Sequence, residues 1–206
     1  MTKIITISRE FGSGGRELGH YLAKLMNYAY YDKEIITEIA SRQNLDEGFV
    51  KNVLNKRWDY PSYVCGRTFV SCATWNTDIK ILVEEQRVIK ELATKGNCII
   101  VGRSAEAILK NFQPYSIFVY ADSESKLKRC RRYEPEGENL SDDMMIKKMM
   151  QIDKTRAHHH DMVASYKWGS REGYRLCINT SGWKIEELAN IVKQLIEEWF
   201  IFNENK

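Results

Sequence analysis

The sequence predicts an α/β protein whose mostly parallel sheet, of about five strands, is covered by helices on both faces. Short apolar segments alternate with amphipathic helical segments along the chain, as in strands joined by helical crossovers. The 206 residues, of which 43% are hydrophobic and 29% charged, suffice for one substantial core. The first apolar segment also leads through a glycine-rich stretch into a helix. We therefore expect one three-layer domain.

The predicted strands are short, with few charged side chains. They are Lys3–Ser8, Ala29–Tyr31, Cys98–Val101, Ser116–Ala121 and Arg175–Asn179. Such near-continuous apolar runs are typical of strands buried on both faces of a sheet.

Helical periodicity predicts the connections between these strands. The expected helices are Glu17–Met26, Lys33–Arg42, Asp46–Asn55, Asp78–Thr94, a short helix that ends at Asn111, Ser123–Tyr133, Asp143–His160 and Lys184–Phe202. Residues 58–75 mix aromatic side chains with Pro61 and Gly66, so we expect a loop there that serves as a dimer contact or as part of a substrate pocket.

The net charge and the apolar runs of the chain argue against two classes of function, nucleic-acid binding and membrane spanning. A net charge of +3 is too small to indicate nucleic-acid binding, and no apolar run approaches the roughly 18 residues of a membrane-spanning helix. The basic segment 126–132 is most often a solvated helix face. Five cysteines without a CxxC pair favour reduced thiols, so we expect a cytoplasmic protein.

The stretch "ITISREFGSGGREL", residues 5–18, is the strongest functional signal. Gly12, Gly14 and Gly15 allow a tight turn with inward-pointing N–H groups, and the helix that follows adds partial positive charge at its N-terminus. These features predict an anion site. The alternative is a glycine-rich connection without a ligand.

Several segments together resemble the cytidylate kinase-like family, a branch of the P-loop nucleoside monophosphate kinases. They are "ITISREFGSGGRELGHYLAKLMNYAYYDKEII", "IIVGRSAEAIL", "FVYADSESKLKRCRR" and "IDKTRAHHH…YKWGSREGYRLCINTS". The resemblance covers nearly the whole chain. It implies a P-loop NTPase-type fold over residues 1–206, with a helical acceptor-binding or interface region at 33–90 and a lid at 129–170.

The resemblance also implies a role for individual residues. The donor phosphates would lie against Gly12, Ser13, Gly14, Gly15 and Arg16. Asp32 and Arg103 would bind the acceptor nucleotide, and Ser104 replaces the aspartate of the family's Gly-Arg-Asp motif. Arg129, Arg131 and Arg132 would border the lid. Asp153 and Arg156 match the lid's Asp-x-x-Arg, and the catalytic set would be Arg16, Arg103, Asp153 and Arg156.

The implied activity is ATP-dependent phosphoryl transfer to a nucleoside monophosphate, with CMP or dCMP as the expected acceptor, ATP as donor and Mg²⁺ as cofactor. The partners would be small nucleotides, not nucleic acid or membrane, with a homodimer as one possibility. The P-loop lysine is missing: its position falls on Gly15 or Arg16, and that of the following hydroxyl on Arg16 or Glu17. No residue is assigned as a metal ligand. A weak or inactive nucleotide-binding module and a kinase for another small molecule remain alternatives.

Simpler interpretations exist for three of these features. Arg103 alone is typical of a surface ion pair. Asp153 and Arg156 lie three residues apart, where a local ion pair forms on one helical turn. The tract 158–160 consists of histidines, but three consecutive helical positions point in different directions and cannot all bind one ion.

Overall fold

The computed structural model describes residues 2–56, 72–133 and 140–205. In this part of the chain five strands form one parallel sheet in the order β2-β3-β1-β4-β5. Their bounds are β1 Ile4–Arg9, β2 Ala29–Tyr31, β3 Cys98–Val101, β4 Tyr115–Tyr120 and β5 Leu176–Asn179. All five predicted strands are confirmed, to within a few residues at their ends.

Strand β1 is the centre of the sheet. Ile5 pairs with Ile99 of β3 on one side and with Tyr115 of β4 on the other, in parallel register. A strand with partners on both edges and helices on both faces must be apolar throughout, and residues 4–8 are all buried. The residues that follow β1 therefore emerge in the middle of the sheet's carboxyl edge.

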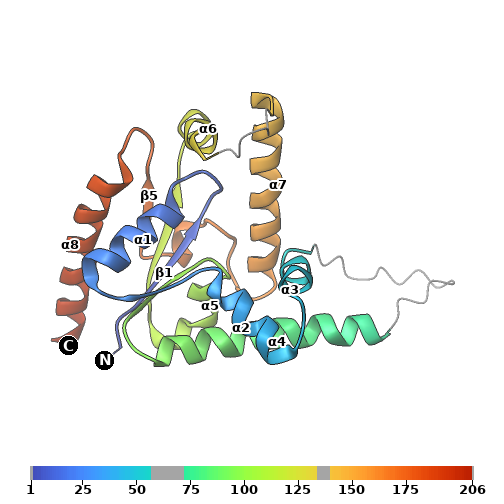
Figure 1. The fold of residues 1–206 in the computed structure, drawn as a ribbon. Helices are drawn as coiled ribbons and strands as arrows, with labels where there is room; N and C mark the ends of the chain where they lie inside the picture. Colours follow the sequence, from blue (N-terminus) through green and yellow to red (C-terminus); the bar gives the residue numbers. More distant parts are fainter. Residues whose placement is uncertain (1, 57–71, 134–139, 206) are drawn as a thin grey trace.

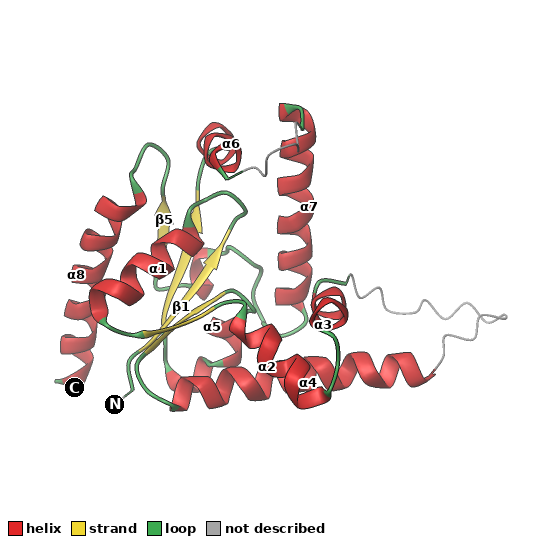
Figure 2. Cartoon of the chain, viewed as in Figure 1, coloured by secondary structure: helices red, strands yellow, loops and turns green. Residues whose placement is uncertain are grey.

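Helices cover both faces of the sheet (Figures 1 and 2). One face carries α1 (Gly15–Met26) and α8 (Ile185–Glu204). The opposite face carries α2 (Glu34–Gln43), α3 (Glu47–Leu54), α4 (Cys72–Thr94) and α5 (Ala105–Ile108). Helices α6 (Ser123–Arg132) and α7 (Asp142–Asp161) follow β4, and short 3₁₀ turns span Lys110–Phe112 and Arg171–Gly173.

One predicted boundary is wrong. Helix α4 begins at Cys72, six residues before the expected start at Asp78, so residues 72–75 are helical rather than part of a loop. The rest of the expected loop, up to residue 71, lies outside the described residues.

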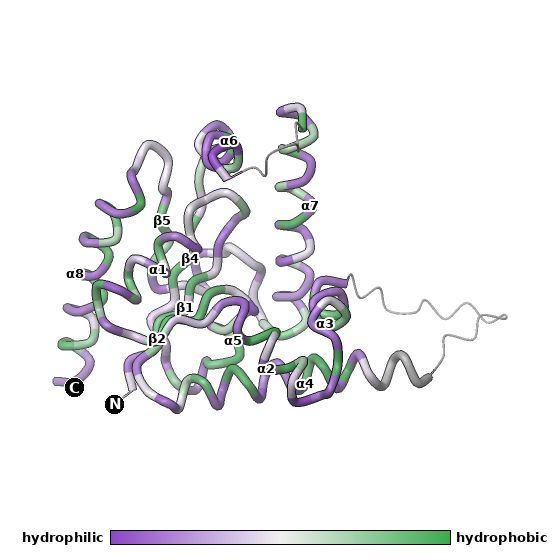
Figure 3. Tube along the Cα trace, viewed as in Figure 1, coloured by the Kyte–Doolittle hydropathy of each residue, from purple (hydrophilic) through white to green (hydrophobic). Residues whose placement is uncertain are grey.

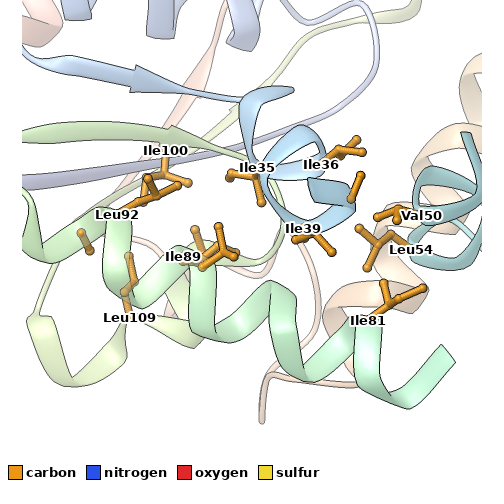
Figure 4. Close-up of a cluster of buried hydrophobic side chains, with 14 of the residues drawn as sticks. Ile35, Ile36, Ile39, Val50, Leu54, Ile81, Ile89, Leu92, Ile100 and Leu109 are labelled. Atoms are coloured by element: carbon orange, nitrogen blue, oxygen red, sulfur yellow. The ribbon is translucent and has the colours of Figure 1, made fainter. Parts of the chain in front are cut away.

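Alternation along the strands sends side chains into two cores. Ile5 and Ile7 pack with α1 and α8, whereas Ile4 and Ile100 face α2, α4 and α5. Figure 4 shows the second core, in which Ile89 of α4 lies among isoleucines of α2 and β3. In Figure 3 the strands are the hydrophobic centre of the chain, while α7 is largely hydrophilic.

Among the described cysteines, Cys98 is buried and Cys177 is exposed, and both are free thiols. Burial raises the pKa of Cys98 to about 11, so this thiol is unreactive near neutrality. No helix in residues 2–56, 72–133 or 140–205 is long and apolar enough to cross a membrane.

We expect Ile89→Ala to lower the free energy of unfolding by about 2–5 kcal/mol, because it leaves a cavity in the core between the sheet and α4. Val83→Ala on the same helix is the control, since Val83 is 61% exposed, and we expect a change below about 0.5 kcal/mol. Urea titration measures both values. Equal effects for the two variants would contradict this description of the core.

Candidate functional site: a glycine loop and arginine cluster at the end of β1

The loop after β1 lies at the point where the chain direction across the sheet reverses. From β1 the chain crosses to β2 at one edge, and from β4 it crosses to β5 at the other edge. In open α/β sheets, ligands bind outside the carboxyl ends of the strands at such a point. Residues 10–14 form a loop there, and α1 begins directly after it.

The N-terminus of α1 is open to a ligand. Gly14 is its N-cap residue, with φ of 81°, and no side chain of the described residues caps the first turn. The first N–H groups of a helix lack partners within the helix and carry partial positive charge, so they bind anions well. A Cβ on Gly14 would lie 2.6 Å from Ile185 Cδ1, which explains why a glycine is needed at this position.

Buried hydrogen bonds fix the shape of the loop. The Ser13 hydroxyl donates to the Glu10 carbonyl at 2.8 Å, and the Ser13 carbonyl accepts from Thr180 Oγ1 at 2.7 Å. Gly12 packs against α6, where a Cβ would lie 2.9 Å from Cys130 Sγ. The loop is thus held from both sides before any ligand arrives.

Helix α7 also holds the loop. Phe11 N donates to Asp153 Oδ1 at 2.7 Å, and Arg156 Nη1 donates to the Arg9 carbonyl at 3.0 Å. Arg156 lies over the Phe11 ring, 5.7 Å from its centre. Asp153 and Arg156 also pair with each other at 3.2 Å. The expected local ion pair therefore exists, and the same two side chains bind the glycine loop.

Arg9, which was not predicted from the sequence, lies at the centre of the site. Its side chain runs beside Gly15 and ends against Gly102, where a Cβ would overlap its guanidinium group. Two glycines thus make room for one arginine. Arg9 Nη2 lies 3.6 Å from Asp32 Oδ1. As the last residue of an apolar strand, Arg9 has no sequence pattern that marks it as functional.

Three further arginines lie near the Arg9 side chain: Arg16, Arg103 and Arg156. Burial, followed by the charge of Arg156, lowers the pKa of Arg9 to about 9. Burial also lowers the pKa of Arg156. The pKa shift of Arg9 includes repulsion from each of the other three arginines, so all four belong to one electrostatic cluster.

Carboxylates partly neutralise this cluster. Arg16 binds Asp32 through two nitrogens, with Nε 2.5 Å from Oδ2. Arg103 Nη1 lies 3.7 Å from Glu85 Oε1, which is too long for a hydrogen bond. The structure thus brings the predicted residues Arg16, Asp32 and Arg103 together. A polyanion that enters between the arginines would relieve their repulsion.

The other three predicted arginines, all on α6, do not join this cluster. Arg129 donates to the Thr180 carbonyl at 2.6 Å and to Thr180 Oγ1 at 3.2 Å, so it holds the segment after β5 beside the loop. Arg131 pairs with Asp142 at 2.5 Å, and Arg132 is exposed.

The described residues contain no group of three or more His, Cys, Asp and Glu that would hold a metal ion. Mg²⁺ in phosphate-transferring sites is usually bound by one or two carboxylates together with the substrate phosphates. Asp32 and Asp153, which lie beside the anion site, fit this requirement. In the histidine tract, His159 and His160 each face a glutamate instead.

Sequence comparison matches this chain to one family model and to two known proteins. The family model described as "Cytidylate kinase-like family" matches residues 4–182. Cytidylate kinases of Methanocaldococcus jannaschii and Methanococcus maripaludis are each 29% identical to this chain, over 110 and 132 residues. These alignments cover 52% and 63% of this chain. The chain spans 60% of the length of the first relative and 71% of the second.

Solved structures show the same fold. An uncharacterized protein from Eubacterium ventriosum is 26% identical, with a TM-score of 0.69 over 95% of this chain and 98% of the other. Shikimate kinase from Bacteroides thetaiotaomicron is 17% identical, with a TM-score of 0.58 over 96% and 99%. The predicted three-layer α/β fold of the P-loop kinase type is confirmed.

We expect Gly102→Ala to weaken the binding of pyrophosphate, because the new Cβ would displace the Arg9 guanidinium. Gly182→Ala is the matched control: Gly182 has φ of 75° against 80° for Gly102, and no atom of the described residues lies within 4 Å of the place where its Cβ would stand. Both variants incur a similar backbone strain. The loss of unfolding free energy in Gly182→Ala therefore measures how much this strain alone destabilises the protein. Calorimetry that finds wild-type pyrophosphate affinity for Gly102→Ala would contradict this geometry.

We expect Arg9→Met to raise the melting temperature in anion-free buffer at pH 7. The lowered pKa of Arg9 means that the folded state disfavours its charge, and at pH 7 this cost is present in full. The same change removes most of the stabilisation by added pyrophosphate. Thermal melts with and without the anion test both effects. A variant that melts lower without the anion, yet gains as much from it as the wild type, would refute this assignment.

Proposed function

The chain belongs to the cytidylate kinase-like family, and on that premise we propose that it transfers the terminal phosphoryl group of ATP to a nucleoside monophosphate, with CMP or dCMP as the acceptor. The convergence of four arginines on the open N-terminus of α1 carries this proposal. Such a density of guanidinium groups suits two phosphate chains that meet end to end.

The donor phosphates bind the loop from Gly12 to Arg16 in this proposal. Backbone N–H groups and the α1 dipole hold the phosphate oxygens. Arg9 and Arg16 supply the positive charge that a P-loop lysine would otherwise provide, since both point at Asp32 beside the loop. Bound Mg²⁺ would neutralise further charge on the transferred group.

The acceptor binds on the side of Asp32 and Arg103, next to helices α2, α3 and α4. Its attacking group is a phosphate oxygen that is already ionised, so no general base is needed. The protein's task is to align the attacking and leaving oxygens and to neutralise charge in the transition state. Arg103 grips the acceptor phosphate, and Arg156 reaches the transferred group from α7.

The lid spans residues 129–170 in this proposal, with the end of α6 and all of α7, while its residues 134–139 lie outside the described residues. Asp153 and Arg156 already bind the loop backbone, so lid movement changes the site directly. Closure excludes water, which would otherwise hydrolyse the donor. We place this activity in the cytoplasm. A homodimer stays a prediction.

A second candidate function is nucleotide binding without efficient turnover. The lysine and the following hydroxyl of a P-loop are both missing, since their positions fall on Gly15, Arg16 or Glu17. The nearby Ser13 hydroxyl donates to the Glu10 carbonyl. Loss of one transition-state contact costs on the order of 10²–10³ in rate. A protein of this kind would bind ATP tightly and turn it over slowly.

We expect magnesium-dependent conversion of ATP to ADP in the presence of CMP or dCMP, with UMP and AMP as comparison acceptors. Arg16→Ala and Arg103→Ala should each lower kcat/KM on the order of 10²–10³-fold, because each removes a guanidinium from the phosphates. Coupled assay and product chromatography measure this. ATP binding without turnover on any acceptor would favour the second candidate, and ADP without a nucleoside diphosphate would indicate another acceptor.

A further inference from the structure

Arg103 belongs to a ring of four side chains, together with Glu85, His159 and Ser104. Arg103 Nη1 lies 3.7 Å from Glu85 Oε1, and the other oxygen of Glu85 lies 2.9 Å from His159 Nε2. His159 Nδ1 in turn lies 3.3 Å from Ser104 Oγ, and Ser104 follows Arg103 in the chain. Glu85 comes from α4 and His159 from α7, so three separate segments meet here.

All members of this ring are removed from solvent. The side chains of Glu85 and His159 are only 2% and 8% exposed, and that of Arg103 is 17% exposed. A carboxylate in such surroundings needs partners, because an uncompensated buried charge is costly. Glu85 Oε1 has no hydrogen-bond partner among the described residues, so the nearby Arg103 cation is what compensates it.

The backbone at this point is strained. Gly102, Arg103 and Ser104 have φ of 80°, 59° and 50° in succession, and two of them are not glycine. Left-handed conformations are unfavourable for residues other than glycine and persist only where the surroundings hold them. The contact between Ser104 and His159 is one such restraint, and it acts one residue from Arg103.

We propose that Glu85 and His159 are positioning residues that hold the Arg103 guanidinium toward the acceptor phosphate. The inference rests on the proposed function. His159 Nε2 donates to Glu85, which fixes the carboxylate, and the carboxylate attracts Arg103 without a direct hydrogen bond. The N–H groups of Arg103 thus stay available for a phosphate.

The same arrangement links the two sides of the site. Arg156 and His159 lie three residues apart on α7 and so on one face of that helix. Arg156 binds the backbone of the phosphate loop, while His159 reaches the ring around Arg103. Figure 1 shows α7 extending from α6 toward α4, as these contacts require. A movement of α7 therefore changes both sides together.

The structure provides a matched control pair. His160 Nε2 lies 3.3 Å from Glu106 Oε1, and both side chains are at most 1% exposed. Glu106 also accepts hydrogen bonds from Ser8 and Tyr174. This pair lies between α7 and α5, but His160 Nε2 has no hydrogen-bond partner among the described residues, and the contacts of Glu106 lead to β1 and Tyr174 rather than to Arg103. It thus matches the burial of the Glu85–His159 pair without the proposed role.

The kinetic test compares Glu85→Gln with Glu106→Gln. We expect Glu85→Gln to raise KM for CMP about tenfold and to leave KM for ATP unchanged, whereas Glu106→Gln lowers stability without changing either KM. In the background of Arg103→Ala, Glu85→Gln should have no further effect on KM for CMP. Additive effects in this double-mutant cycle, or equal effects of the two glutamine variants, would overturn the proposal.

A second measurement does not depend on kinase activity. In ¹⁵N NMR spectra the Arg103 Nε–H signal is assigned as the one absent from Arg103→Lys. We expect the chemical shift of this signal to change in Glu85→Gln and His159→Phe, because both alter the charge or the position of the carboxylate beside the guanidinium, but not in Glu106→Gln. An unchanged signal in Glu85→Gln refutes the positioning role. A changed signal in a protein without turnover would leave the positioning intact and reject only the proposed function.

Discussion

The arginines at the carboxyl edge of the sheet carry positive charge that nearby carboxylates must compensate. The positions of these carboxylates determine the packing around the site. A buried guanidinium without a partner costs several kcal/mol. Asp32 accordingly faces Arg9 and Arg16, while Asp153 pairs with Arg156. Because these carboxylates come from the segment after β2 and from α7, compensation ties distant parts of the chain to the loop after β1.

The same constraint explains the polar character of α7. An ordinary surface helix buries an apolar stripe, but α7 directs Asp153, Arg156, His159 and His160 toward the rest of the protein. Residues 153–160 of α7 are attached through hydrogen bonds and ion pairs, which are directional and lose strength when their geometry changes. Such an attachment would suit the lid movement proposed for α7.

The sequence predicted the sheet well and the site in part. Continuous apolar runs such as Cys98–Val101 mark buried strands, and the glycines after β1 mark the loop. The sequence does not predict a role for Arg9, because no sequence pattern distinguishes the last residue of a strand. Its side chain also fits only because residue 102, which is distant in sequence, is a glycine. The hydrogen bonds from Arg129 to Thr180 likewise join residues that are 51 positions apart. Such pairings between remote residues are set by tertiary packing, which periodicity does not encode.

The central claim is that donor and acceptor phosphates meet within one arginine cluster. The most direct measurement is calorimetric titration with a bisubstrate compound in which adenosine and cytidine are joined through five phosphates. If the two subsites are adjacent, the compound should bind far more tightly than ATP or CMP alone, because the second contact is then intramolecular, and Arg9→Met should remove most of the gain. Binding no tighter than that of ATP would contradict the account.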